Sequence, residues 1–271
     1  MATRTAPALF SLFSPETRTA PDNSLSPDRQ LHPGRHRPSP SVAPAGGNAT
    51  APLRAAAASP AIALRRDTGM RSPIIAARAG DCGLGAALLD SMYRLRAEVF
   101  HQRLGWDVRV EDGREHDWFD LIGPYYLVAH DGAQNALGCC RLLPSTGPNM
   151  LRDVFPALLD GAPAPAAESI WEISRFAIAP QCAGDGYGFG PLAGALLGRM
   201  IHFADRMAGT EVVGVTTVAV ERLLLHMGLE VRRLGRPRPI GRVMSLAFSI
   251  PIHAANLEVA GLHDPQAVRA A

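Results

Sequence analysis

The sequence predicts an α/β protein with one large folded domain. Three observations carry this prediction: strand-like and helix-like segments alternate after residue 72, a glycine-rich turn joins a strand to a long helix, and 47% of the residues are hydrophobic while 19% are charged. Such a composition is ordinary for a globular protein with a sizeable core. Because no apolar run is long enough to cross a bilayer, we expect no membrane partner.

The first 71 residues differ from the rest of the chain. They are rich in Pro, Ser, Ala and Arg, lack apolar periodicity, and hold nine arginines against four acids. This composition predicts a disordered extension over 1–71, followed by the folded domain over 72–271. It also fits an organellar transit peptide, but we favour an upstream start assigned in a GC-rich gene, with Met70 as the true initiator.

The folded part begins with a short strand at 73–78 and an amphipathic helix at 84–104, whose apolar residues recur every three or four positions. A polar, acidic loop follows at 107–120. The next segments are a hairpin that turns at Asp131-Gly132, with strands at 125–130 and 136–143, and a short helix at 151–159. The rest of the order is a strand at 170–180, a helix at 191–207, a strand at 211–218, a helix at 219–227, and strands at 229–234 and 242–250.

The strand at 170–180 is the most informative segment. It carries Glu172 and Arg175, two charges in an otherwise apolar strand, and buried charges are costly unless they are paired or used. With a period of two, Glu172, Ser174 and Phe176 share one face and Arg175 points to the other, unless a bulge intervenes. The two charges form either a structural ion pair or part of a functional cleft.

Charge and cysteine content exclude several functions. The chain has a net charge of +2 and the extension contributes +5, so residues 72–271 carry −3 and we expect no nucleic-acid binding. The four cysteines show neither CxxC nor Cys/His ligand spacing, which predicts no metal site and reduced thiols in a cytoplasmic protein. The adjacent residues Cys139 and Cys140 are expected on opposite faces of a strand.

The segment after the strand predicts an anion-binding turn. Glycines let backbone N–H groups approach phosphate oxygens, and the dipole of the following helix favours negative charge. The spacing of Gln181, Gly184 and Gly186 resembles the phosphopantetheine loop of the GCN5-related N-acyltransferase superfamily. The order of elements resembles that superfamily too, which implies a single-domain α/β/α sandwich with a central mixed, largely antiparallel sheet.

Several separated motifs narrow the resemblance. They are Tyr93-x-Leu95-Arg96-x-x-Val99-Phe100, then Trp106, then Glu115-x-Asp117-x-Phe119-Asp120, then Gly138-Cys139-Cys140-Arg141-Leu142-Leu143-Pro144, and Glu172-x-Ser174-Arg175-Phe176. Together and in this order they resemble the LuxI-type acyl-homoserine-lactone synthases, the autoinducer synthases of quorum-sensing bacteria. The resemblance spans roughly residues 74 to 250 and leaves the extension out.

The resemblance implies an activity and a set of site residues. An acyl group carried by acyl carrier protein would be transferred to the α-amine of S-adenosylmethionine, and the product would lactonise with release of methylthioadenosine, without a further cofactor. Glu172 would be the base or the carboxylate that orients the amine, and Arg175 the strand arginine. The S-adenosylmethionine site would be shaped by Arg96, Phe100, Trp106, Asp117, Asp120, Arg141, Ser174 and Phe176.

These residue types fit the chemistry. A carboxylate can help the amine lose its proton, Asp117 and Asp120 favour the sulfonium and ammonium groups, and Arg96 or Arg141 can bind the carboxylate of the substrate. The same four residues could instead form an ion network that pins the acidic loop. The two interpretations are compatible, because a pinned loop can wall a pocket.

The acyl chain requires an apolar tunnel. We expect it between the strand at 170–180 and the helix at 191–207, lined by residues such as Leu196, Met200 and Phe203, although each also fits ordinary core packing. In the family, a threonine near Val218 tends to accompany 3-oxo-acyl substrates. Both Thr216 and Thr217 lie there, so the assignment stays open.

Acyl carrier protein is acidic, and the most basic stretch of the folded part is 222–242. We expect it to steer docking of the carrier protein, although a solvated basic face is the alternative. Its arginines are Arg222, Arg232, Arg233, Arg236, Arg238 and Arg242. Two other functions stay open: an N-acyltransferase of the same fold that uses acyl-CoA and another amine, and a non-catalytic binding or scaffold protein.

Overall fold

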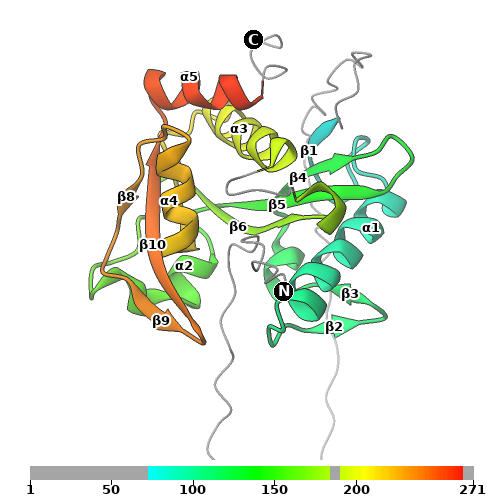
Figure 1. Ribbon diagram of the computed structural model, residues 1–271, viewed down its shortest axis with the longest axis horizontal. Helices are drawn as coiled ribbons and strands as arrows, with labels where there is room; N and C mark the ends of the chain where they lie inside the picture. Colours follow the sequence, from blue (N-terminus) through cyan, green and yellow to red (C-terminus); the bar gives the residue numbers. More distant parts are fainter. Residues whose placement is uncertain (1–72, 184–189, 265–271) are drawn as a thin grey trace, which may run out of the picture. The chain divides into compact units, whose positions relative to one another are not determined.

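The computed structural model describes residues 73–183 and 190–264 (Figure 1), and the extension predicted at 1–71 lies outside them. Eight strands form the main sheet, in the order β1-β4-β5-β6-β7-β10-β8 with β9 paired to β10. Among the strands of the described residues, only β6 and β7 pair in parallel, which confirms a mixed, largely antiparallel sheet. The strands are β1 (Ile74–Arg78), β4 (Tyr125–His130), β5 (Ala136–Pro144), β6 (Ile170–Ile178), β7 (Glu211–Thr217), β8 (Arg232–Arg233), β9 (Arg238–Ile240) and β10 (Val243–Pro251).

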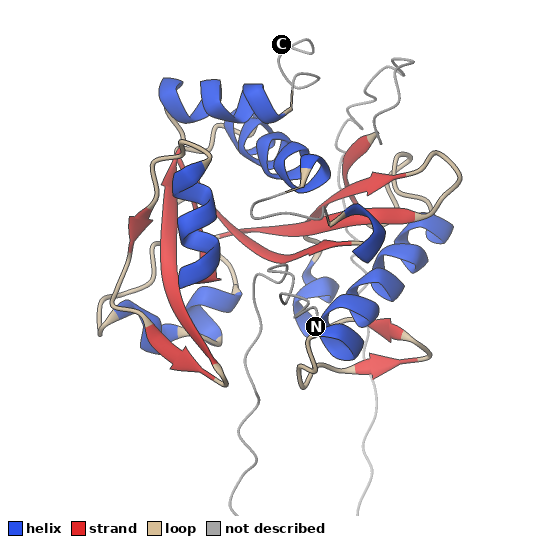
Figure 2. Ribbon diagram, in the orientation of Figure 1, coloured by secondary structure: helices blue, strands red, loops and turns tan. Residues whose placement is uncertain are grey.

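Helices cover both faces of this sheet (Figures 1 and 2). One face carries α1 (Ala86–Arg96), and the other carries α3 (Pro191–Arg206) with α5 (Ala254–His263) packed on it. Cys139 packs in the core cluster built on α1, whereas Cys140 packs in the cluster that contains α3, so the prediction of opposite faces is confirmed. The remaining α-helices are α2 (Met150–Asp153) and α4 (Val218–His226), whose N-cap is Thr217.

Several elements differ from the sequence predictions, and β9 is one that was not predicted. The helix predicted at 84–104 is α1 followed by a π-helix, η1 (Ala97–Arg103), and apolar spacing alone does not separate these two helix types. The helix predicted at 151–159 is divided into α2 and a 3₁₀-helix, η3 (Pro156–Leu159), because Pro156 lacks the N–H needed to continue α2. The strand predicted at 229–234 is reduced to β8, and α5 was not predicted.

The acidic loop has structure of its own. It contains a small hairpin, β2 (Val110–Glu111) and β3 (Arg114–Glu115), followed by a 3₁₀-helix, η2 (Trp118–Ile122). The hairpin turns at Asp112 and Gly113, whose φ angles are 51° and 76°. Asp-Gly is a strong hairpin signal, and the short flanking strands are the reason that the sequence pattern did not reveal it.

A bulge interrupts β6 at Arg175. Its partner β5 pairs regularly on both sides, but Arg175 and Phe176 together lie opposite the single residue Cys140. The φ angle of Arg175 is 52°, in the left-handed region that few side chains adopt. Bulges re-aim side chains and are frequent beside active sites.

The bulge places Ser174 and Arg175 on the same face of the sheet and turns Phe176 to the other face. Phe176 packs in the core cluster that contains α3, and the next residue, Ala177, packs in the cluster built on α1. The alternative with a bulge is therefore the one that the structure adopts. As a result Arg175, and not Phe176, shares a face with Glu172 and Ser174.

The two parallel strands pair over only part of their length. Residues 170–173 of β6 pair with 211–214 of β7, and no further pairing between these strands occurs in the described chain. A Cβ atom on Gly214 would lie 2.9 Å from the carbonyl oxygen of Ile173, so the last paired position needs a glycine. Beyond it the strands separate, one residue past Glu172.

Within the described ranges, no helix combines the length and the apolar character needed to span a membrane.

A buried ion pair ties α3 to the end of α5. The side chains of Arg199 and Asp264 are 2% and 3% exposed. Arg199 donates from Nε and Nη2 to the carboxylate, and its Nη1 donates to the carbonyl oxygen of Ile74 in β1 at 3.3 Å. One guanidinium thus joins three elements.

We expect Asp264→Ala to lower the free energy of unfolding by about 3–5 kcal/mol, because it leaves the guanidinium of Arg199 buried without its partner. The double variant Arg199→Met with Asp264→Ala removes both charges and should be more stable than Asp264→Ala alone. Denaturant unfolding at neutral pH measures both. Equal stability of the single and double variants would contradict the assignment of the pair.

Candidate active site

Six charged side chains form a buried network beside the bulge. The carboxylates come from β3 and η2, and the arginines from α1, β5 and β6. The members are Arg96, Arg141, Arg175, Glu115, Asp117 and Asp120. Three positive and three negative charges cancel, which is the condition under which so many ionised groups can be buried together.

Arg96 binds two of the carboxylates. Its Nε donates to Oε2 of Glu115 at 2.6 Å, and its two terminal nitrogens donate to the two oxygens of Asp120 at 2.9 Å each. Burial acts to raise the pKa of Asp120, but Arg96 and Arg141 outweigh it and hold that pKa well below its usual range. Asp120 is therefore a permanent anion.

The other two arginines share Asp117. Nη1 of Arg141 donates to Oδ1 of Asp117 at 2.5 Å and to Oδ1 of Asp120 at 2.9 Å. Nη2 of Arg175 lies 3.0 Å from Oε1 of Glu115 and 2.7 Å from Oδ2 of Asp117. These two ion pairs offset the backbone strain of the positive φ angle at Arg175.

Glu172 lies on the same face of β6, and none of the salt bridges among the described residues reaches it. It is 1% exposed, and its Oε2 accepts a hydrogen bond of 3.3 Å from Oγ of Ser174, which accepts one of 3.1 Å from Nε of Arg141. Burial raises the pKa of Glu172 to about 7, against the opposing effects of Arg141 and Ser174. A carboxyl group with this pKa can take up or release a proton near neutral pH, as a general base must.

Two aromatic rings flank the network. Phe100 of η1 and Trp106 are stacked, with ring centroids 5.3 Å apart and planes 9° apart. The guanidinium carbon of Arg175 lies 5.6 Å from the centre of the Phe100 ring. The structure thus brings together the two aromatic residues and the charged residues that the sequence motifs single out.

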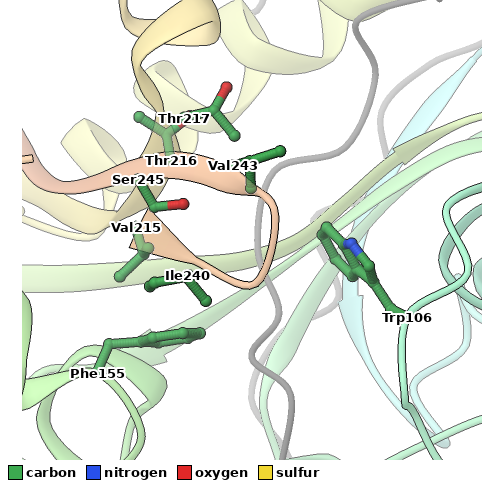
Figure 3. Close-up of a pocket in the computed structure, with 8 residues that line it drawn as sticks. All are labelled: Trp106, Phe155, Val215, Thr216, Thr217, Ile240, Val243 and Ser245. Carbon is green, nitrogen blue, oxygen red and sulfur yellow. The ribbon is translucent and has the colours of Figure 1, made fainter. Parts of the chain in front are cut away.

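A small pocket, part of it open to solvent, lies on the β7 side of the separated strands (Figure 3). It is lined by Trp106, Phe155, Val215, Thr216, Thr217, Ile240, Val243 and Ser245. Oγ1 of Thr216 is buried and has no hydrogen-bond partner among the described residues. Oγ1 of Thr217 instead accepts a bond from the backbone N–H of Val220 at the start of α4. The lining of the pocket is therefore mainly apolar, and one of its residues carries a buried hydroxyl group without a hydrogen-bond partner in the described chain.

The pocket does not lie where the acyl tunnel was predicted. Three predicted tunnel residues are at most 2% exposed in the main core cluster, and none of them lines the pocket: Leu196, Met200 and Phe203. Phe176, 2% exposed, belongs to the same cluster. Their helical spacing and apolar character reflect packing of α3 against the sheet.

The glycine-rich turn is described only at its two ends. Gln181 is exposed in a 3₁₀-helix, η4 (Pro180–Cys182), and Gly184 and Gly186 lie outside the described residues. The helix α3 begins at Pro191 after Gly190, so the predicted order of strand, turn and helix is confirmed on both sides.

All six arginines of the basic stretch are exposed, but four of them are paired with acids. Arg232 binds Glu230, and Arg233 binds Glu221 of α4. Asp160 accepts bonds from both Arg236 and Arg238. In the described part of the chain, the two without a salt bridge are Arg222 and Arg242.

Sequence reasoning missed several residues that the structure places in the site. Glu115 bridges Arg96 and Arg175, and its position at the head of the motif with Asp117 and Asp120 was the available signal. Tyr126 of β4 donates from its hydroxyl group to Asp120 at 2.8 Å. Four pocket residues come from separate segments without a local signal: Phe155, Ile240, Val243 and Ser245.

Comparisons with known proteins agree with this geometry. The autoinducer synthase family model matches residues 84–259. An acyl-homoserine-lactone synthase of Pseudomonas aeruginosa is 39% identical over 169 residues, which cover 62% of this chain and 84% of the relative.

Two solved structures are similar to this chain along most of its described length. The crystal structure of the AHL synthase LasI has a TM-score of 0.62 and 36% identity, and the match covers 70% of this chain and 95% of that one. A CoA-dependent acyl-homoserine lactone synthase, BjaI, solved with SAM and isopentyl-CoA, has a TM-score of 0.65 and 25% identity, with coverage of 73% and 98%. Because the family model spans more than half of the chain, this protein belongs to the autoinducer synthase family, acyltransferases that make acyl-homoserine-lactone signals for quorum sensing.

Proposed function

We propose that this chain transfers an acyl group from acyl carrier protein to the α-amine of S-adenosylmethionine, and that the product lactonises with release of methylthioadenosine. The observation that carries the proposal is Glu172, a buried carboxyl group with a pKa of about 7 beside the point where β6 and β7 separate. A base with a pKa near the working pH is ionised often enough to accept a proton and basic enough to hold it.

The chemistry assigns a task to this carboxylate. In the first step the amine nitrogen forms a bond to the thioester carbon, the carbon–sulfur bond breaks, and the amine proton passes to Glu172 directly or through a water molecule. In the second step the substrate carboxylate attacks its own γ-carbon, and the bond to the sulfonium sulfur breaks. Glu172 has no part in the second step, which releases no proton.

The network supports binding of a cationic substrate at its edge. Arg96, Glu115 and Asp120 are sealed, with side chains at most 2% exposed, so they shape the site without reaching a ligand. Asp117 is 17% exposed and is the carboxylate that a sulfonium or ammonium group can approach. The partly exposed ring of Trp106, stacked on the buried Phe100, offers a surface for the same cation, and the relative solved with SAM supports this substrate.

The pocket supports an acyl chain with an oxygen near its reacting end. Its walls are mostly apolar, and they include Thr216, whose buried hydroxyl group has no partner among the described residues and could donate a hydrogen bond to a 3-oxo group that reaches it. Thr217 is the weaker candidate, because its hydroxyl group already caps α4.

Two acyl donors, acyl carrier protein and acyl-CoA, are compatible with the fold. The exposed Arg222 and Arg242 favour an acidic carrier protein, whereas the CoA-dependent relative makes acyl-CoA the alternative donor. A different amine acceptor would give no reason for the partly exposed Asp117 to lie beside the aromatic pair.

The replacement Glu172→Gln keeps the size of the side chain and removes the base. We expect N-acyl homoserine lactones in organic extracts of bacteria that express the full chain, and a fall of about 10²–10⁴-fold with the variant. Mass spectrometry measures both and names the acyl chain. A soluble variant with wild-type yield would rule out Glu172 as the base.

The pH profile tests the same group independently. Only ionised Glu172 accepts a proton, so kcat/KM should rise as pH increases through about 7. Ser174→Ala removes a hydrogen bond that stabilises the ionised form, so the pKa of Glu172 rises and the midpoint moves to higher pH. The amine of the substrate titrates identically in both proteins and cancels in the comparison. An unmoved midpoint would contradict the role of Glu172.

Docking of a carrier protein is tested at the arginines that are free of ion pairs. Arg222→Glu with Arg242→Glu should raise KM for acyl carrier protein roughly tenfold and reduce its salt dependence. Arg109→Glu is the control, because it reverses an exposed charge next to the β2–β3 hairpin, at an arginine that pairs with Glu111. An unchanged KM for the carrier substrate, with normal use of acyl-CoA, would favour the CoA donor.

A further inference from the structure

Asp160 joins two segments that are far apart in sequence, the end of η3 and the start of β9. It follows η3 directly, with a φ angle of 51°, and its side chain is 24% exposed. Its carboxylate accepts a bond of 2.7 Å from the backbone N–H of Arg236, one of 3.3 Å from Nε of Arg236, and one of 2.7 Å from Nη2 of Arg238. The end of η3 is thus clamped to the start of β9.

The backbones meet closely at this contact. A Cβ atom on Gly235 would lie 2.1 Å from the carbonyl oxygen of Leu158, a distance that no side chain tolerates. The segment before β9 therefore lies directly on the last turn of η3. Gly235 lies next to a carboxylate that accepts three hydrogen bonds. Together they indicate a fixed junction between the two segments and not an incidental surface ion pair.

The same two segments wall the pocket. Phe155 stands at the start of η3, and Ile240 stands at the end of β9 (Figure 3). The two side chains lie next to each other in the close-up, with Trp106 on the other side of the cavity. Any movement of η3 relative to β9 changes the separation of Phe155 and Ile240, and with it the depth of the pocket.

We propose that Asp160, through Arg236 and Arg238, fixes this end of the pocket and so limits the length of the acyl chain that the protein accepts. The inference rests on the proposed function, because it takes the pocket as the acyl site. Asp160 is a positioning residue that acts through Phe155 and Ile240. In this role Arg236 and Arg238 serve the interior of the site, and not the docking of a carrier protein.

Four variants of the full chain test the proposal, each expressed in bacteria whose extracts are analysed by mass spectrometry for the acyl chains of their homoserine lactones. Asp160→Ala removes the carboxylate of the clamp, and the double variant Arg236→Gln with Arg238→Gln removes the guanidinium groups that bind it. Ile240→Ala enlarges the pocket directly. Glu230→Gln is the matched control, because it breaks the neighbouring ion pair with Arg232 and leaves the clamp intact.

We expect both clamp variants to shift the products toward longer acyl chains, as Ile240→Ala does. The ratio of products with longer acyl chains to products with the wild-type acyl chain should rise by about tenfold. Glu230→Gln should keep the wild-type distribution. Thermal unfolding of each protein is recorded in parallel, since a merely structural contact would lower stability and yield without changing this ratio.

Two results would overturn the inference. If Ile240→Ala lengthens the products and the clamp variants do not, the pocket holds the acyl chain but Asp160 does not set its depth. If Ile240→Ala also has no effect, the pocket is not the acyl site. Absence of any homoserine lactone with the soluble wild-type protein would instead overturn the proposed function, and this inference with it.

Discussion

The site depends on the cancellation of six buried charges. Arg96, Arg141 and Arg175 are each engaged by carboxylates, and loss of any one group would leave a buried charge uncompensated, at a cost of about 3–5 kcal/mol. This balance also governs Glu172. Because the arginines near it are already neutralised by Glu115, Asp117 and Asp120, they lower its pKa only partly, and burial dominates. A carboxyl group among arginines can therefore keep a pKa of about 7.

The bulge at Arg175 makes this arrangement possible. In a regular strand Arg175 would point toward α3, and Glu115 and Asp117 would lack one of their cations. The extra residue brings the guanidinium to the face of Glu172 while Phe176 still fills the core on the other side. One local departure from regular geometry thus supplies both the third positive charge and a complete core. The strain at Arg175 is held by two ion pairs, and the order of the acidic loop follows from the same contacts.

The sequence predicted the order of strands and helices from local patterns, and most of the charged site from the resemblance of its separated motifs to the family. Apolar periodicity located α3, and the motif residues Arg96, Asp117, Asp120 and Arg141 do meet in space. The pocket could not be predicted, because Phe155, Ile240 and Ser245 come from three segments that only the fold brings together. The residues predicted to line the tunnel show the same limit: Leu196 and Met200 lie in the core, their spacing is that of any helix that packs on a sheet, and spacing does not distinguish a core from a cavity.

Counting charges along the chain overstated the basic surface for the same reason. The stretch 222–242 holds one internal acid, but Glu221 and Asp160 from outside it neutralise three further side chains. What remains is Arg222 on α4 and Arg242 at the turn between β9 and β10, next to the pocket residue Val243. An acidic partner drawn to Arg242 would therefore arrive at the pocket. Under the two proposals, the arginines paired with Asp160 hold the wall of the pocket, and the two without an ion pair among the described residues would attract an acidic donor to its edge.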